Sequence, residues 1–461
     1  MNKNCLVSFF TLLSFTLAGQ VQNSSPEPRE GYWMGVMKVS EQMSLQMAYE
    51  LRKNEQGRWS AKMNVIEQKA FDIPMDECVM AGDSIHIKFA AAGITYDGLY
   101  SKDEQVIFGS YGQGGGHFTL DLTWVEALTT EVERPQTPVR PFPYDEEDVK
   151  FENSREGIFL AGTLTKPSDQ KNLPAVVLIA GSGRNDRDET SMGHFLLLSD
   201  FLTRNGFAVL RYDKRGVGDS EGDYAQATTF DFADDAKAAM EYLKGHPDID
   251  PGTIGLIGHS EGAMIAPILT SEYPEEISFI VLMGGVGIPG SELLLIQAEK
   301  MSRIAGVPEE EIKQTLENNR KLYDIARSDE PDSIIAVKMK EAVPEVDESM
   351  FNMLQSDWVR TFISLDMDIY ISKVKCPVLA ITGENDIQCP PAENLTAIEA
   401  SLQKAGNENF SIEEMPGLNH LFQTSESGSP LEYEQLPEII SPDVLKTILE
   451  WMNGVTHSPG E

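Results

Sequence analysis

Residues 253–264 read TIGLIGHSEGAM, and this stretch decides the fold. A short apolar run ends in the pattern Gly-His-Ser-Glu-Gly at 258–262, and small and apolar residues follow. The pattern predicts a strand, a sharp turn and a helix, with glycines beside Ser260 because side chains there would clash. Such a turn lifts the Ser260 hydroxyl above the sheet edge and places it at a helix N-terminus, where unpaired N–H groups favour negative charge. Ser260 is therefore a candidate nucleophile; the alternative is a serine that only caps the helix.

A serine nucleophile needs a base, and the base needs a carboxylate that orients it. Asp386 lies just past the apolar run 376–383, where a buried strand is expected to end, and Glu384 is the competing acid. His420 ends a loop after a further predicted strand, and His194 is the only other candidate base among the seven histidines. The alternative for each is a polar residue on a surface loop. The predicted set is Ser260, Asp386 and His420.

Four patterns together resemble one family. Residues 177–188 (VLIAGSGRNDRD) look like an oxyanion loop, and residues 211–220 (RYDKRGVGDS) fit D-x-R-G-x-G-x-S. The serine turn and the pair GEND at 383–386 with GLNH at 417–420 complete the set. In this order and spacing, residues 147–455 resemble the α/β-hydrolase superfamily, in particular bacterial serine-aminopeptidase-like and esterase-type hydrolases. The resemblance implies a mostly parallel, doubly wound sheet.

The resemblance also implies a mechanism. His420 would take the proton of Ser260, and Asp386 would hold the imidazole in the right tautomer. The oxyanion would be bound by the backbone N–H of Glu261 and, by resemblance, by that of Ser182, with Gly183 as the alternative. No metal or organic cofactor is expected, since the sequence has no HExxH, no clustered Cys/His spacing and no P-loop.

Charged residues crowd the predicted oxyanion loop. They could bind a polar group of the substrate, but we expect them to pair with each other and hold the loop. The same expectation applies to two residues of the D-x-R-G segment, which is expected to shape the loop and do no chemistry. These charged residues are Arg184, Asp186, Arg187 and Asp188 in the loop, and Asp213 and Arg215 in the segment.

The first twenty residues are predicted to be a signal peptide. A short basic start precedes an apolar stretch over residues 5–19, which is too short for a comfortable membrane span. We therefore expect export to the periplasm or the medium, without a membrane anchor. Cleavage of the signal peptide would leave three of the four cysteines, and because three is odd, at least one thiol is free. The net charge of −36 argues against nucleic acid and anionic membranes as partners; the oligomeric state is left open.

Residues 29–130 are predicted to form a separate β-rich domain. Short alternating segments, divided by turn residues, favour a small antiparallel barrel or sandwich. A ligand cup is one hypothesis for it, and a packed domain that braces the catalytic unit is the preferred one. The Pro-rich and acidic residues 131–147 are predicted to be a linker.

Residues 148–461 are predicted to form the hydrolase domain. Near-continuous apolar strands alternate with helices, which indicates a mostly parallel sheet covered on both faces. The core strands are expected at 175–179, 208–212, 254–257, 280–283, 378–382 and 410–415, and the helices at 193–205, 229–244, 260–271 and 442–453. Between residues 286 and 375 the alternation stops, and four amphipathic segments, the last over 350–363, predict an inserted helical cap. Several large side chains of the cap could line an acyl pocket, although packing inside the cap is favoured: Met301, Met339, Met350, Met353, Trp358 and Phe362.

The expected activity is hydrolysis of small exported carboxylic esters through an acyl-enzyme on Ser260. One alternative is an aminopeptidase-like serine peptidase, which would need a cap carboxylate for the free amine of its substrate. The cap offers four candidates for that role: Glu309, Glu310, Glu311 and Glu317. Another alternative is a non-enzymatic binding protein on a hydrolase scaffold, which has no need of a complete Ser260, Asp386 and His420 set.

Overall fold

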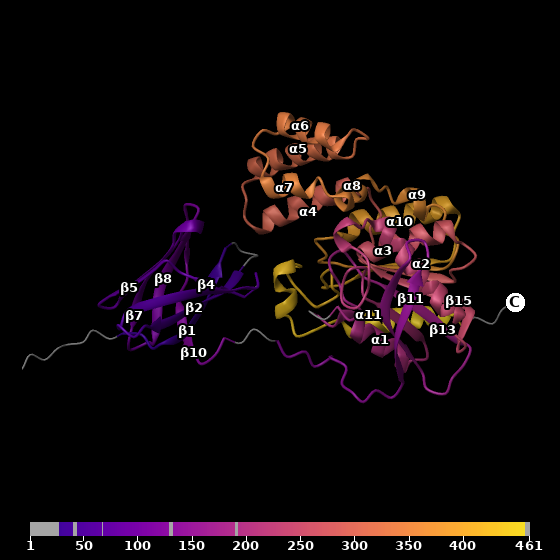
Figure 1. The fold of residues 1–461 in the computed structure, drawn as a ribbon, viewed down its shortest axis with the longest axis horizontal. Helices are drawn as coiled ribbons and strands as arrows, with labels where there is room; N and C mark the ends of the chain where they lie inside the picture. Colours follow the sequence, from indigo (N-terminus) through magenta and orange to yellow (C-terminus); the bar gives the residue numbers. More distant parts are fainter. Residues whose placement is uncertain (1–26, 40–43, 67, 129–131, 190–191, 457–461) are drawn as a thin grey trace, which may run out of the picture. The chain divides into compact units, whose positions relative to one another are not determined.

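The computed structural model describes residues 27–39, 44–66, 68–128, 132–189 and 192–456. The chain forms two compact units, one built mainly from residues up to Leu128 and one mainly from the residues after it (Figure 1). The signal peptide predicted over residues 1–20 lies outside the described residues. Within the described part of the chain, no helix has the length and apolar character that a membrane span requires.

The N-terminal unit is all β, as predicted. Its strands follow the order β4-β3-β2-β1-β10-β8-β7-β6-β5, with β9 paired to β8, and every pairing that is described is antiparallel. Strands β3 and β5 are in contact although they lie near opposite ends of this order, so the sheet curls until its ends meet. The strands are β1 (Gly31–Lys38), β2 (Ser44–Lys53), β3 (Trp59–Val65), β4 (Ala70–Pro74), β5 (Glu77–Ala81), β6 (Ser84–Phe89), β7 (Ile94–Ser101), β8 (Val106–Gln113), β9 (Gly116–Thr119) and β10 (Leu122–Val125).

The core of this unit comes from side chains on one face of the strands. Trp33, Tyr49, Leu51, Tyr96 and Ile107 are fully buried, because alternate residues of a strand point to the same face. The alternating segment 118–124, which the sequence predicts as one strand, is divided between β9 and β10. The division follows a change of partner, since β9 pairs only with β8 whereas β10 lies between β8 and β1.

The larger unit is built on an eight-stranded sheet in the order β11-β12-β14-β13-β15-β16-β17-β18. From β14 to β18 all neighbours are parallel, and the hairpin β11–β12 adds an antiparallel edge. The strands are β11 (Asp145–Asn153), β12 (Ile158–Lys166), β13 (Leu173–Ile179), β14 (Ala208–Tyr212), β15 (Ile249–His259), β16 (Phe279–Met283), β17 (Val378–Gly383) and β18 (Phe410–Met415). Strand β11 begins inside the segment 131–147 that the sequence predicts as a linker.

Helices cover both faces of this sheet. One face packs against α2 (Thr229–Gly245), α3 (Glu261–Glu272) and α10 (Pro391–Ala405), and the other packs against α1 (His194–Arg204) and α11 (Pro442–Thr456). The sequence shows why: successive residues of a strand point to opposite faces, and both sets are apolar in β13. The doubly wound α/β fold is therefore confirmed.

The insertion between β16 and β17 is helical (Figure 1). Its buried side chains form a core of their own. It contains α4 (Gly290–Ile304), α5 (Glu309–Ala326), α6 (Asp332–Ala342), α7 (Glu348–Met353) and α8 (Asp357–Ser364), followed by the short α9 (Asp368–Ile371). The prediction of a single helix over 350–363 is wrong. Two helices replace it because the side chains of Asp347 and Ser356 each cap a new helix start.

Candidate active site

Ser260 lies in a strained turn between β15 and α3. Its backbone has φ 55° and ψ −114°, a conformation that non-glycine residues rarely adopt. A Cβ atom at Gly258 would overlap the carbonyl oxygen of Gly262, and one at Gly262 would overlap the carbonyl oxygen of Ile179. The two glycines are therefore required by backbone packing, and the turn presents Ser260 at the start of α3.

His420 and Asp386 form a buried pair. His420 Nδ1 is 2.7 Å from Asp386 Oδ2, and the side chains are 4% and 0% exposed. The other oxygen of Asp386 accepts hydrogen bonds from the backbone N–H groups of Gln388 (2.8 Å) and Cys389 (2.7 Å). These bonds fix the carboxylate so that it orients the imidazole. His420 and Ser260 line the same cavity, so the structure brings the predicted set together.

The competing candidates have other partners. Glu384 accepts a hydrogen bond from the backbone N–H of Gly417 at 2.8 Å. His194 lines the same cavity as Ser260, but its Nε2 is 3.2 Å from the carbonyl oxygen of Leu421, and its Nδ1 is 3.2 Å from Glu189. Geometry thus favours Asp386 over Glu384 and His420 over His194.

The imidazole rings of His194, His259 and His420 are neighbours at the site. The ring of His259 lies between His194 and His420, at centroid distances of 5.1 and 4.7 Å. His259 Nε2 donates a hydrogen bond to the carbonyl oxygen of His420 at 3.0 Å. Burial, aided by the nearby His420 and His194, lowers the pKa of His259 well below its usual value. His259 is therefore a neutral donor that holds the backbone of His420.

The residues that carry the predicted oxyanion donors line the same cavity. Glu261 is the first residue of α3, so its N–H has no acceptor within the helix. A Cβ atom at Gly181 would lie 3.1 Å from Ser260 Cβ, which shows how closely the predicted oxyanion loop passes the serine. Gly183 has φ +106°, a value that favours glycine. Ser182, Glu261 and Ser260 all line the cavity.

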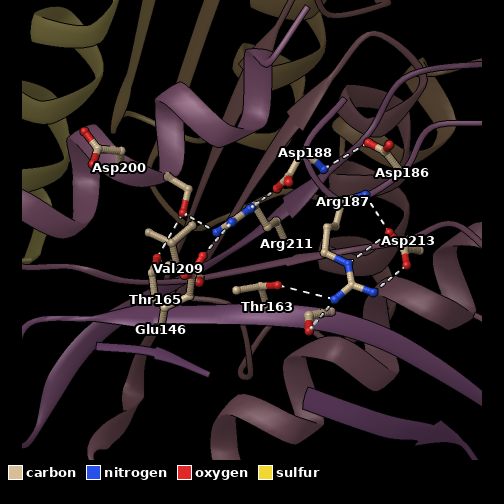
Figure 2. A network of polar contacts seen from close by, with 12 residues as sticks. Glu146, Thr163, Thr165, Asp186, Arg187, Asp188, Asp200, Val209, Arg211 and Asp213 are labelled. Carbon is tan, nitrogen blue, oxygen red and sulfur yellow. Dashed lines mark hydrogen bonds and ion pairs between the residues drawn. The ribbon is translucent and has the colours of Figure 1, made fainter. Parts of the chain in front are cut away.

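Ion pairs hold the loop that follows Gly183 (Figure 2). Arg187 binds both carboxylate oxygens of Asp213, at 3.0 and 2.6 Å, and Arg211 Nε lies 2.6 Å from Asp188 Oδ1. Arg211 itself is buried on β14 and also donates to Ser199. The loop charges pair mainly with β14 and the segment after it, whereas the sequence predicts pairing among themselves. The arrangement anchors the loop, as charge-assisted bidentate pairs do.

The remaining charges of this region have structural partners too. Arg215 Nε is 2.7 Å from Asp235 Oδ2, and Arg215 Nη1 is 2.8 Å from Glu156. Arg184 donates to the carbonyl oxygen of Gly216 at 2.6 Å. Asp186 accepts a hydrogen bond from the backbone N–H of Asp188 at 3.2 Å. These contacts support the expectation that the D-x-R-G segment shapes the loop.

The cap contributes an apolar wall to the cavity. Trp358 and Phe362 of α8 are stacked at a centroid distance of 5.4 Å and line the cavity together with Leu293, Leu294 and Val286. The methionines named from the sequence do not line it: Met339 is buried in the cap core, Met350 packs against that core, Met353 is exposed, and Met301 lies on α4 outside the cavity wall. Among the described residues, no group of three or more metal-ligating side chains is found.

Two polar side chains of the site were given no role by sequence reasoning. The carboxylate of Glu261 is fully buried, and the ammonium of Lys214 is paired with it at 3.0 Å. Trp358 Nε1 also donates to Glu261, at 2.6 Å. The sequence gives one signal for them, since Lys214 lies in the D-x-R-G segment and Glu261 in the serine turn, but their contact depends on the fold.

Known proteins resemble this chain in sequence. Residues 175–426, more than half of the chain, match the family described as serine aminopeptidase, S33. The chain is 26% identical over 335 residues to the esterase EstD of Thermotoga maritima, covering 72% of this chain and 73% of that protein.

Solved structures of esterases resemble the chain as well. The structure of Est1E from Butyrivibrio proteoclasticus with bound ferulic acid is 17% identical and has a TM-score of 0.43, covering 67% of this chain and all of that one. The Pyrococcus furiosus esterase Pf2001 is 19% identical with a TM-score of 0.42, covering 71% and 100%. The family match and the observed fold agree, and the chain belongs to the S33 serine aminopeptidase family of α/β hydrolases.

Proposed function

We propose that the protein is a serine carboxylesterase that cleaves small esters through an acyl-enzyme on Ser260. The observation that carries the proposal is the buried pair of His420 and Asp386, in which His420 lines the same cavity as a serine with positive φ. The family membership and the relationship to an esterase support ester hydrolysis. The signal peptide expected at residues 1–20 supports substrates outside the cytoplasm, and a mature N-terminus near residue 20 would be its signature in mass spectrometry.

The groups of the site have distinct roles in this mechanism. His420 removes the proton from the Ser260 hydroxyl as the oxygen attacks the ester carbonyl, and Asp386 stabilises the imidazolium that forms. The N–H groups of Glu261 and Ser182 bind the tetrahedral oxyanion. His420 then gives its proton to the departing alcohol, and a water activated by the same imidazole hydrolyses the acyl-enzyme.

The cap side of the cavity suits an ester better than a peptide with a free amine. Trp358, Phe362 and the leucines of α4 present apolar surface, which suits the acyl chain or alcohol of an ester. The cap glutamates considered for amine binding, Glu309, Glu310, Glu311 and Glu317, are exposed on α5 and do not line the cavity.

The test is turnover of p-nitrophenyl acetate, butyrate and octanoate by wild type and Ser260→Ala. We expect kcat to fall by about 10⁴-fold or more, because the oxygen that attacks the carbonyl is gone. Ser271→Ala is the matched control on the same helix, since its hydroxyl only bonds the carbonyl oxygen of Ile268. Undiminished turnover in Ser260→Ala would contradict the proposal. Cleavage of aminoacyl-anilides without any ester turnover would favour the peptidase.

A further inference from the structure

Lys214 and Glu261 form a buried ion pair beside the serine turn, and the mechanism above does not use it. Lys214 Nζ is 3.0 Å from Glu261 Oε2, and the side chains are 4% and 0% exposed. Lys214 follows β14, whereas Glu261 opens α3. Burying two charges is costly, so such a pair is weak evidence for stability, and its other contacts must show its purpose.

The second contact of Lys214 indicates that purpose. Its Nζ donates to the carbonyl oxygen of Gly181 at 2.8 Å, and Asn185 Nδ2 donates to the same oxygen at 3.0 Å. The carbonyl of Gly181 and the N–H of Ser182 belong to one planar peptide group, in which the two bonds point in opposite directions. Donors that hold the oxygen therefore also set the direction of the Ser182 N–H, which belongs to a residue lining the cavity of Ser260.

The ammonium acts on the charge distribution of that peptide as well as on its direction. A positive charge next to the carbonyl oxygen draws electron density through the amide and makes the N–H a stronger donor. The effect is stronger where water is excluded than in water, and Lys214, Glu261 and His259 are all buried. A negative charge that develops next to the N–H is stabilised by this polarisation, whereas a neutral ester carbonyl gains much less.

Glu261 keeps the ammonium in place through its other oxygen. Its Oε1 accepts hydrogen bonds from Trp358 Nε1 at 2.6 Å and Thr229 Oγ1 at 2.9 Å. Because Oε1 is held in this way, Oε2 is fixed at the position that Lys214 occupies. The centroid of the Phe232 ring lies 4.0 Å from Lys214 Nζ, so the face of this ring also stabilises the ammonium.

We propose that Lys214 is a positioning residue that aims and polarises the Ser182 N–H of the oxyanion hole through the Gly181 carbonyl, with Glu261 as its anchor. The inference rests on the proposed function, since it assumes that Ser182 binds the oxyanion. It predicts that Lys214 contributes to binding of the transition state and little to binding of the substrate.

Lys214→Met tests this inference. We expect kcat/KM on p-nitrophenyl butyrate to fall about 10- to 100-fold, mostly in kcat. A wrongly oriented donor gives up part of the transition-state stabilisation that removal of the donor would abolish. KM is expected to change by less than about threefold. An alkyl boronic acid, which forms a tetrahedral anion on the serine, is expected to bind weaker by the same factor as the fall in kcat/KM.

Two further variants separate positioning from folding. Lys214→Met leaves the Glu261 charge buried alone, so the double variant K214M/E261Q removes both charges and is expected to regain thermal stability but not kcat. Lys166→Met is the matched control, because Lys166 is also a buried lysine, paired with Asp145 and Asp248, and does not line the cavity. It is expected to lower Tm and to leave kcat and boronate affinity unchanged.

The outcomes separate the two proposals. Wild-type kcat and boronate affinity in K214M/E261Q would overturn the role of Lys214. A loss explained wholly by fewer active sites, counted with a fluorophosphonate, would also overturn it, because each folded molecule would then be fully active. If Ser260→Ala in the same panel keeps its turnover, the proposed function itself fails.

Discussion

At Gly262 the serine turn has no room for a side chain. A Cβ atom there would overlap the carbonyl of Ile179 at the end of β13, and β13 is hydrogen-bonded on both sides by β14 and β15. Because the backbone of β13 is held on both sides and cannot move away, we expect Gly262→Ala to lower the free energy of unfolding by about 3 kcal/mol. We also expect ester turnover to fall, since the loop after β13 carries Ser182. Urea unfolding and p-nitrophenyl butyrate turnover measure the two effects.

Gly245→Ala is the matched control for this substitution. Gly245 is the last residue of α2, and a Cβ atom there would have no heavy atom within 4 Å. Alanine has the higher helix propensity, so the change is expected to be neutral or to stabilise by up to about 1 kcal/mol. A Gly262→Ala protein as stable as wild type would mean that the turn is looser than the structure indicates.

Much of the candidate site follows from the sequence because its residues lie at strand ends. Ser260 follows β15 directly, and Asp386 lies just past β17, at the carboxyl edge that parallel strands share. The contacts of Lys214 and Trp358 with Glu261 do not follow, because they join segments 47 and 97 residues apart. Spacing in the sequence carries no information about which buried donors meet one carboxylate.

Among the elements, helix α8 is joined to the serine turn by one hydrogen bond. Trp358 Nε1 donates to the carboxylate of Glu261 at 2.6 Å. Trp358→Phe keeps an aromatic ring beside Phe362 but removes this donor, and a hydrogen bond to a charged group contributes about 1.5–3 kcal/mol. We therefore expect a lower Tm and a KM for p-nitrophenyl octanoate raised several-fold, because α8 is less firmly placed over the cavity.

Trp451→Phe is the matched control for Trp358→Phe. Trp451 lies on α11 and packs edge-on against Phe279, on the face of the sheet opposite the cap. Its replacement is expected to leave KM for every ester unchanged. An unchanged KM in Trp358→Phe would show that the bond does not position α8.

Element types are better predicted by the sequence than element boundaries. All six predicted core strands correspond to observed strands: 175–179, 208–212, 254–257, 280–283, 378–382 and 410–415. The first five are buried parallel strands, which are near-continuous apolar runs, whereas β18 is a partly exposed edge strand. Helix α10 was not predicted, although Leu395, Ile398 and Leu402 recur on its buried face. The break between α7 and α8 depends on two capping side chains, which a pattern of apolar residues does not register.

For the whole molecule, the division of the chain is visible in the change of periodicity. Alternating segments before residue 130 predict an all-β unit, and alternating strands and helices after residue 148 predict the α/β unit. What the β unit does is not predictable in the same way. Alternation shows which face of a strand is buried, but it does not identify a ligand or a partner for the surface that remains.

Separate cores predict separate unfolding transitions. Leu51 is fully buried in the β unit, and Leu243 is fully buried against the sheet of the α/β unit. Each leucine-to-alanine change is expected to cost about 2–5 kcal/mol, because it leaves a cavity in one core only. In calorimetry, Leu51→Ala should therefore lower one transition and leave ester turnover at 25 °C unchanged, whereas Leu243→Ala should lower the other. If both variants shift one common transition by similar amounts, the two units unfold as a single cooperative body, and a lesion in the β unit would then also shorten the lifetime of the α/β unit on heating.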